Sequence, residues 1–140
     1  MLNSKRVFMA IALVLLLAGC ESMSPIKAFK DKDKQDTLTK TLHSYELTVR
    51  WGELTQIYTF LEPDMARGTI KQDNLNNIRV TGYEVIKGPA STGENDAIQT
   101  AKIDYIFSDR QVQKTIIDTQ TWVYKPDQKE WRRTNPIPKF

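Results

Sequence analysis

The sequence predicts an α+β domain in which a helix pair, or one kinked helix, packs on a curved four-stranded antiparallel meander. Two patterns support this fold class. After Thr37 the apolar residues recur three and four positions apart, which is typical of one helix face. After Ile78 the chain is dense in β-branched and aromatic residues, and turn residues separate four such runs. Because the helical pattern comes first and the strand patterns follow, we expect helices laid across one sheet.

The chain begins with the organisation of a secretory signal. Lys5 and Arg6 form a positive region, and an apolar core of eleven residues follows at 7–17. This core is too short for a transmembrane helix, which needs about 20 apolar residues. It leads into the run Leu17, Ala18, Gly19 and Cys20. A plain signal peptide would also be cut after small residues such as Ala18 and Gly19, but a cysteine at the next position indicates lipidation.

This run resembles the lipobox of bacterial lipoproteins. The resemblance implies that residues 1–19 are a signal peptide, that the bond between Gly19 and Cys20 is cut, and that Cys20 receives acyl chains such as palmitate. Two or more chains attach a protein firmly, because each buried methylene contributes about 0.8 kcal/mol. Glu21 is not the aspartate that retains such proteins in the inner membrane of enteric-type bacteria, which favours the outer membrane facing the periplasm.

Processing would also change the charge and the chemistry of the chain. The full sequence holds 20 Lys and Arg against 17 Asp and Glu, and removal of Lys5 and Arg6 leaves 18 against 17. A nearly neutral protein lacks the general positive surface that neutralises nucleic-acid phosphates, so we expect no nucleic-acid partner. Cys20 is the only cysteine, and its acylation would exclude disulfides, thiol redox chemistry and a zinc-thiolate site. We expect neither a metal nor a cofactor.

The mature N-terminus, residues 20–36, is expected to be a lipidated tether to a single domain at 37–140. Pro25 and the alternating charges at 30–34 favour an extended, solvated segment. The alternative is a solvated first helical turn, which an aspartate of this segment could cap.

The first helix is predicted at 37–50 and the second at 54–62, just before Pro63. Gly52 between them lowers helix propensity by up to about 1 kcal/mol and marks a bend. Two apolar faces result, formed by Leu38, Leu42, Tyr45 and Val49 and by Leu54, Ile57, Tyr58 and Leu61. The aromatic residues Trp51, Tyr58 and Phe60 are expected in the core.

Four strands are predicted at 78–87, 98–108, 111–124 and 131–134. A longer loop with Gly88, Pro89 and Gly93 follows the first strand, and tight turns follow the second and third. In the second strand, apolar residues at 103, 105 and 107 alternate with Lys102 and Asp104. This alternation indicates a sheet that is buried on one face and solvated on the other.

This order of elements resembles the NTF2-like superfamily. The resemblance covers about 37–136 and rests on the helix pair, the stretch 50–64 and the long strands that end in Trp122, Tyr124 and Trp131. It implies a cone whose sheet wraps around the helices and often leaves an apolar pocket. Members include isomerases, dehydratases and non-catalytic binding or assembly modules, so the fold does not decide the function. The candidate pocket residues are Tyr45, Tyr58, Tyr105 and Trp122, although the three tyrosines also fit a packed core.

No residue is assigned as catalytic. His43 is the only histidine, and we expect it on the surface or in a structural role. Asp104 is expected to form a solvated ion pair with Lys102. Asp118 lies in a polar stretch and fits a strand edge or a solvent face as well as a pocket. The sequence has no Ser/His/Asp grouping, no phosphate-binding glycine loop and no His-carboxylate metal spacing.

Aromatic and basic residues alternate near the end of the sequence. The aromatic ones are Trp122, Tyr124 and Trp131, and the basic ones are Lys125, Lys129, Arg132 and Arg133. Together they could contact an anionic surface. The alternative is a hairpin whose tryptophans lie in the core and whose cations stay in water. The tail at 135–140 has two prolines and is expected to be extended, either packed along the domain or free.

The function that these features favour is that of a lipid-anchored envelope lipoprotein, a non-enzymatic module that binds an unidentified envelope protein or takes part in an assembly. One alternative is a binder of a small apolar ligand in the cone pocket. Another is an enzyme of the isomerase or dehydratase type. A homodimer through an exposed sheet face is a further option.

Overall fold

The computed structural model describes the backbone of residues 25–140 and the side chains of residues 31–140. The predictions for the signal peptide, its cleavage at Gly19 and Cys20, and lipidation lie outside these residues. The chain divides into two compact units, Met1–Lys32 and Asp33–Phe140. Of the first unit, the structure describes the start of helix α2, and the sheet and the other helices belong to the second. Within the described part of the chain, no helix is long and apolar enough to cross a membrane.

Helix α2 (Pro25–Trp51) begins earlier than predicted. The extended conformation expected for residues 20–36 is therefore wrong from Pro25 onward, because this stretch is helical, as in the alternative interpretation. Proline suits the first turn of a helix, and lysine and glutamine are good helix formers, so the charged composition does not oppose the helix. Tertiary contacts stabilise the helix around Lys34, whose ammonium donates to the Glu94 carbonyl at 2.6 Å and whose carbonyl accepts from Trp131 Nε1 at 3.0 Å.

The chain leaves α2 at Gly52. The Gly52 N–H donates to the carbonyls of Leu47 and Thr48, and a Cβ at this position would lie 2.9 Å from the Thr48 carbonyl oxygen. Glycine therefore permits a close approach that other residues would disturb. The predicted bend and helix pair are confirmed, but the second helix, η1 (Leu54–Phe60), is a 3₁₀-helix. Two further short helices follow, α3 (Pro63–Gly68) and η2 (Leu75–Asn77).

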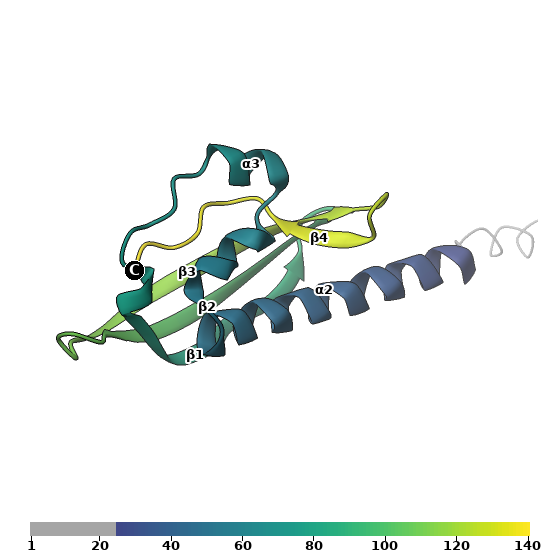
Figure 1. Ribbon diagram of the computed structural model, residues 1–140. Helices are drawn as coiled ribbons and strands as arrows, with labels where there is room; N and C mark the ends of the chain where they lie inside the picture. The colour runs from purple at the N-terminus through teal and green to yellow at the C-terminus, as the bar shows by residue number, and fades with distance from the viewer. Residues whose placement is uncertain (1–24) are drawn as a thin grey trace, which may run out of the picture. The chain divides into compact units, whose positions relative to one another are not determined.

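The sheet is an open antiparallel meander with strand order β1-β2-β3-β4, as predicted (Figure 1). Its strands are β1 (Ile78–Ser91), β2 (Asp96–Phe107), β3 (Gln113–Lys125) and β4 (Glu130–Arg133). β1 is longer than predicted, because the region of Gly88 and Pro89 stays in the strand as a register shift instead of forming a loop. β1 and β4 are the two edge strands.

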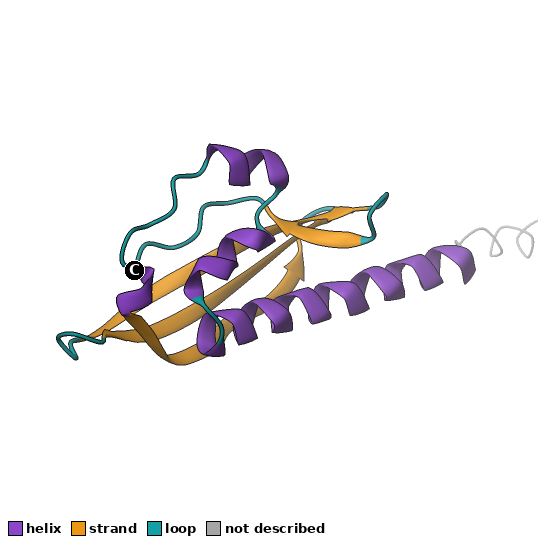
Figure 2. Ribbon diagram, in the orientation of Figure 1, coloured by secondary structure: helices purple, strands orange, loops and turns teal. Residues whose placement is uncertain are grey.

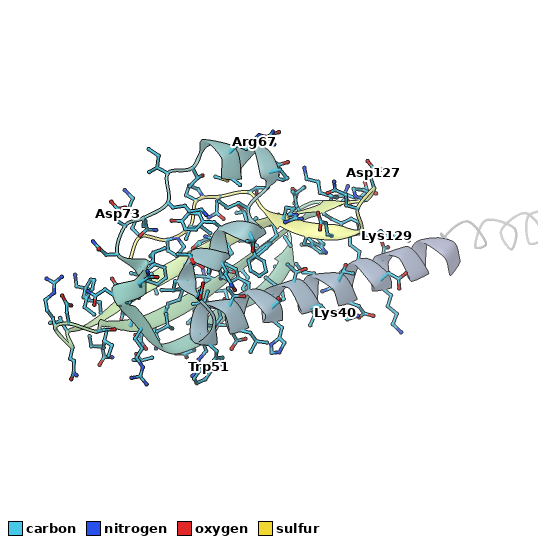
Figure 3. All side chains as sticks on the ribbon, viewed as in Figure 1. Lys40, Trp51, Arg67, Asp73, Asp127 and Lys129 are labelled. Atoms are coloured by element: carbon cyan, nitrogen blue, oxygen red, sulfur yellow. The ribbon has the colours of Figure 1, made fainter. Side chains whose placement is uncertain are left out.

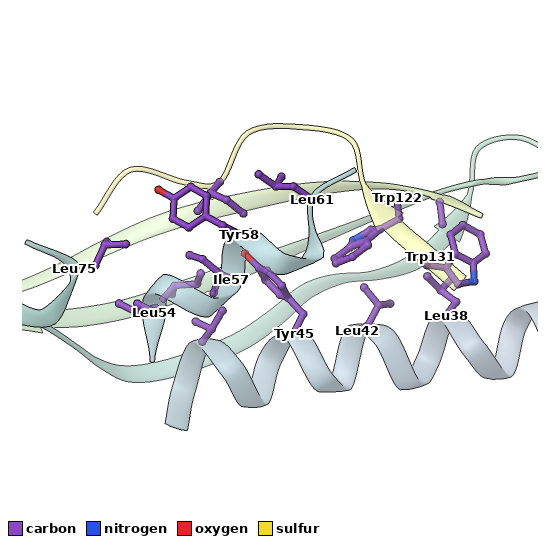
Figure 4. Packing of buried hydrophobic residues seen from close by; sticks show 14 residues of the cluster. Leu38, Leu42, Tyr45, Leu54, Ile57, Tyr58, Leu61, Leu75, Trp122 and Trp131 are labelled. Atoms are coloured by element: carbon purple, nitrogen blue, oxygen red, sulfur yellow. The ribbon is translucent and has the colours of Figure 1, made fainter. Parts of the chain in front are cut away.

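The helices α2 and η1 cover one face of the sheet (Figure 2). Figure 4 shows side chains from α2, η1 and the sheet meeting in one cluster. At its centre Tyr45 makes edge-to-face contacts with Phe60 at 5.3 Å and with Trp122 at 5.6 Å between ring centroids. Such contacts add to the burial of apolar area. The buried hydrophobic residues include those predicted for the two helix faces, namely Leu38, Leu42, Tyr45, Val49, Leu54, Ile57, Tyr58 and Leu61.

Candidate functional site

The four candidate pocket residues are buried, but the structure does not bring them around one cavity. Tyr45 and Trp122 pack against each other in the core. The Tyr58 hydroxyl accepts a hydrogen bond from the Gln72 N–H at 3.0 Å, and Tyr105 packs against the ring of Phe140. None of the four lines the groove of about 900 Å³ at the end of α2.

The sequence-based candidates for acid–base chemistry also lie apart. His43 is exposed on α2, with its ring 4.0 Å from Glu46. The predicted ion pair between Lys102 and Asp104 is wrong, because Lys102 pairs instead with Glu84, its cross-strand partner on β1, at 2.6 Å. Cross-strand neighbours lie closer than residues two apart on one strand, which explains the choice. Asp104 accepts a hydrogen bond from Thr115 Oγ1 on β3.

Asp118 lies in the core and forms an ion pair with Arg133. Both side chains are 1% exposed, and the guanidinium makes two hydrogen bonds to the two carboxylate oxygens, at 2.6 and 3.0 Å. The prediction that the cations near the end of the chain all stay in water is therefore wrong for Arg133. The strand period gives the reason, because Arg133 lies two residues after buried Trp131 and faces the same side of the sheet.

Every N–H of the Arg133 guanidinium has an acceptor. Beyond the two bonds to Asp118, Nη1 donates to the Tyr45 hydroxyl at 2.8 Å, Nε to the Asn135 carbonyl at 3.2 Å and Nη2 to the Pro136 carbonyl at 2.8 Å. Arginine supplies five donors, so its hydrogen-bonding capacity is filled. This pattern is typical of a residue that fixes structure, since no donor remains for a ligand.

The surroundings also fix the protonation states of Tyr45 and Arg133. Burial raises the pKa of Tyr45 well above 10, although Arg133 opposes the rise, so the phenol stays neutral. Burial alone would lower the pKa of Arg133, but hydrogen bonding and charge from Asp118 and its neighbours outweigh it, and the pKa is raised. The guanidinium therefore stays charged against the carboxylate.

Three further polar residues extend the cluster towards β1. Gln120 Nε2 donates to Asp118 at 3.0 Å and to the Tyr83 hydroxyl at 2.8 Å. Burial raises the pKa of Tyr83 to about 12, although hydrogen bonds from glutamines oppose the rise. Gln99 Nε2 lies 3.5 Å from Gln120 Oε1. We name the set formed by Tyr45, Tyr83, Gln99, Asp118, Gln120 and Arg133 the inner polar cluster.

The predicted aromatic and basic patch is not assembled as one surface. Trp122 and Trp131 are buried, as the alternative interpretation expected. Lys125 pairs with Glu62 at 3.3 Å, and Arg132 pairs with Glu130 at 2.7 Å. These cations are therefore occupied by nearby carboxylates.

The tail after β4 packs back along the domain. Its Ile137 is buried, the Pro138 carbonyl accepts from Gln72 Nε2 at 2.8 Å, and the Phe140 N–H donates to Gln72 Oε1 at 3.0 Å. Of the two outcomes left open for this segment, the structure shows the packed one.

A groove with a volume of about 900 Å³ lies where α2 ends, between this end and the start of β1. Its lining includes residues 49–55, four consecutive residues of β1 at 78–81, Leu75, Asn76 and Ile106. The prediction that Trp51 belongs to the core is wrong, since Trp51 is 74% exposed at the end of α2 (Figure 3). Trp51 lies outside the i, i+3, i+4 pattern of the buried helix face, which is the signal that would have placed it in solvent.

The groove combines apolar walls with charge. Val49, Leu54 and Leu75 are buried beneath it, and the Arg50 guanidinium lies 4.7 Å from the Trp51 ring centre. Arginine over an indole face is a cation–π contact that orders both side chains. Volumes of this size are typical of sites that bind small molecules.

Among the described residues, no group of three or more His, Cys, Asp or Glu side chains is placed to hold a metal ion. No protein-family model, curated protein or solved structure matches this chain.

Proposed function

We propose that this protein is a lipid-anchored lipoprotein of the bacterial envelope, whose α+β domain is a non-enzymatic binding or assembly module. The observation that carries the proposal is the run Leu17, Ala18, Gly19 and Cys20 at the end of a short apolar core that follows Lys5 and Arg6. The cysteine would carry the acyl chains, and the domain would face the periplasm, with the outer membrane favoured.

Two features of the domain support binding over catalysis. The buried ionisable residues of the inner polar cluster satisfy each other, and none of them lines the groove. An acid or base for proton transfer must instead reach a substrate. The exposed Trp51 beside an open groove is typical of a binding surface, because tryptophan is enriched among residues that dominate interface energy.

Metabolic labelling with an alkyne analogue of palmitate tests the anchor. The intact protein is expected to take up the label and to sediment with membranes, whereas Cys20→Ala is expected to lose both properties. Ser22→Ala, changed two residues later, serves as a matched control and should retain the label. A protein that is exported but unlabelled, or a Cys20→Ala variant that keeps the label, would refute the proposal.

A second candidate function is the binding of a small apolar ligand, which the volume and apolar walls of the groove favour. Its site would differ from the cone pocket predicted from the sequence, since the lining residues are different. Native mass spectrometry of protein extracted from its own membranes would show a bound ligand as a fixed mass increment. Substitution of Trp51 by alanine should remove that increment.

A further inference from the structure

We propose that the groove at the end of α2 binds an extended segment of another envelope protein, whose main chain adds to the free edge of β1 and whose acidic side chains pair with Arg50 and Arg79. This inference deepens the proposed function and rests on it, because it names the surface and the chemistry of the partner. We call this site, lined by residues 49–55, 75–76, 78–81 and 106, the β1 groove.

The edge of β1 offers backbone groups for pairing. β1 pairs only with β2, whereas the outer edge of β4 is occupied by a bridge between Leu61 and Arg133. The Ser108 N–H donates to the Asn77 carbonyl at 2.8 Å, so these two residues form a hydrogen-bonded pair. Hydrogen-bonded and non-hydrogen-bonded pairs alternate along antiparallel strands. Val80 lies three positions after Asn77 and therefore belongs to a non-hydrogen-bonded pair, whose N–H and C=O face away from β2. An exposed edge of this kind is a template for an added strand.

Register shifts divide this edge into short regular stretches. Register shifts occur between Val80 and Gly82, between Val85 and Lys87, and again before Ala90. Bulges and proline protect edge strands from unwanted pairing, and Pro89 lies in the last of these regions. Between these shifts the regular stretches are 78–80 and 82–85, and only the first of them lines the groove. Within it the Ile78 N–H already donates to the Leu75 carbonyl, so Val80 offers the free N–H. So few main-chain bonds require additional side-chain contacts for a stable complex.

The walls of the β1 groove supply an apolar contact. Trp51 is 74% exposed and lies beside the buried side chains of Val49, Leu54 and Leu75. Arg50 stacks on its ring, which limits the rotamer freedom that binding would otherwise remove. An aliphatic or aromatic side chain of the partner could cover Trp51 and gain most of the affinity there.

The charge of the β1 groove favours an acidic segment. Arg50 and Arg79 line it, and within residues 31–140 neither forms an ion pair. Glu53 is the single carboxylate in the lining, so the net charge there is positive. Complementary charge steers association and rejects partners of the same sign. A second copy of this chain pairing β1 against β1 would bring two Arg79 side chains towards each other, which disfavours a homodimer at this edge.

The groove lies far along α2 from the first residue of the domain. The domain begins at Asp33, and Trp51 lies 18 residues further along the same helix, or about 27 Å at 1.5 Å per residue.

Site-specific photocrosslinking of the full-length protein in its own cells tests the inference. A photoreactive amino acid replaces Thr81 in the groove, and a control protein carries it at Ile117, which is exposed on β3. We expect the Thr81 position to crosslink to one segment of one envelope protein, sequenced by mass spectrometry and containing Asp or Glu. The Ile117 position should not reach that segment.

Charge reversal separates the groove from the rest of the surface. Arg79→Glu is expected to reduce the adduct at least tenfold, whereas Lys87→Glu, on the same strand outside the groove, should leave it unchanged. The recovered segment, made as a synthetic peptide, tests the strand addition directly. Two peptides are compared, one N-methylated at the odd positions and one at the even positions. Only one of the two should lose binding, because only every second N–H of an added strand faces β1.

Several outcomes would overturn the inference. These are crosslinks to a second copy of this chain, crosslinks to lipid or polysaccharide, an adduct insensitive to Arg79→Glu, or no adduct from protein that carries the palmitate label. Palmitate labelling of the same samples distinguishes the two proposals, since loss of the label refutes the lipid anchor, whereas a labelled protein without the adduct refutes only the assignment of the β1 groove.

Discussion

Replacing Asp118 by asparagine is expected to lower the unfolding free energy by about 3–5 kcal/mol, the range found when one partner of a buried ion pair is removed. Asparagine retains the shape of the side chain but removes the negative charge that compensates Arg133. The guanidinium is 1% exposed, so water cannot replace the carboxylate. The asparagine amide would also turn a donor towards one of the two guanidinium nitrogens that now donate to Asp118.

This loss is large compared with the stability of a domain of this size, which is typically about 5–15 kcal/mol. In urea unfolding followed by tryptophan fluorescence, the midpoint should fall by roughly 1 M or more. The buried Trp122 and Trp131 report the transition. Asp104→Asn is the matched control, because Asp104 lies on the solvated face of the same sheet, and its loss should stay below about 1 kcal/mol.

A double variant, Asp118→Leu with Arg133→Met, tests the cause. It removes both charges together, and replacing a buried pair by apolar residues is often neutral. Here the Tyr45 hydroxyl and two tail carbonyls lose donors, so we expect partial recovery relative to Asp118→Asn. A loss of stability for Asp118→Asn no larger than that for Asp104→Asn would refute the reasoning. A double variant less stable than Asp118→Asn would refute it as well.

Three further predictions concern separate parts of the domain. The Tyr83 hydroxyl has a pKa near 10 in the unfolded chain and about 12 in the folded domain, so the free energy of unfolding should fall as the pH rises from 10 to 12. Urea midpoints measured across that range should show this fall, and Tyr83→Phe should make it less steep. Gly52→Ala should cost about 1–3 kcal/mol in thermal unfolding, because its Cβ would press on the Thr48 carbonyl, and an unchanged melting temperature would contradict this. Lys34→Met should lower the free energy of unfolding by about 1 kcal/mol, because it removes the hydrogen bond to the Glu94 carbonyl. It should also speed amide hydrogen exchange in the hairpin between β1 and β2, and an unchanged exchange rate would contradict the contact.

The order of elements could be predicted because it depends on local patterns. Alternation along β2 placed Tyr105 on the buried face, and the three and four spacing placed Leu38 and Tyr45 on the core face of α2. The early start of α2 was missed because its charged first turns suit both a helix and a solvated coil. Contacts of Lys34 with residues about 60 and 97 positions later help to decide between them.

The site was less predictable, for two physical reasons. The charge of Arg133 suggested a position in solvent, whereas its place two residues after Trp131 suggested the core. Asp118, 15 residues earlier on β3, offsets the cost of burying this charge. The β1 groove depends on where α2 ends relative to the free edge of the sheet. That relation arises from tertiary packing, so no spacing within the sequence reports it.

Arg133 also determines how much of the chain must be synthesised before the domain can complete its core. It lies in the last strand of the sheet and joins Tyr45 across 88 residues. During synthesis from the N-terminus, α2 and the first three strands emerge before Arg133, so Asp118 at first lacks its ion-pair partner. Contacts so distant in sequence form slowly, and such partly assembled chains expose apolar surface. A chain interrupted before Arg133 is thus expected to be a substrate for chaperones and proteases instead of a smaller folded domain.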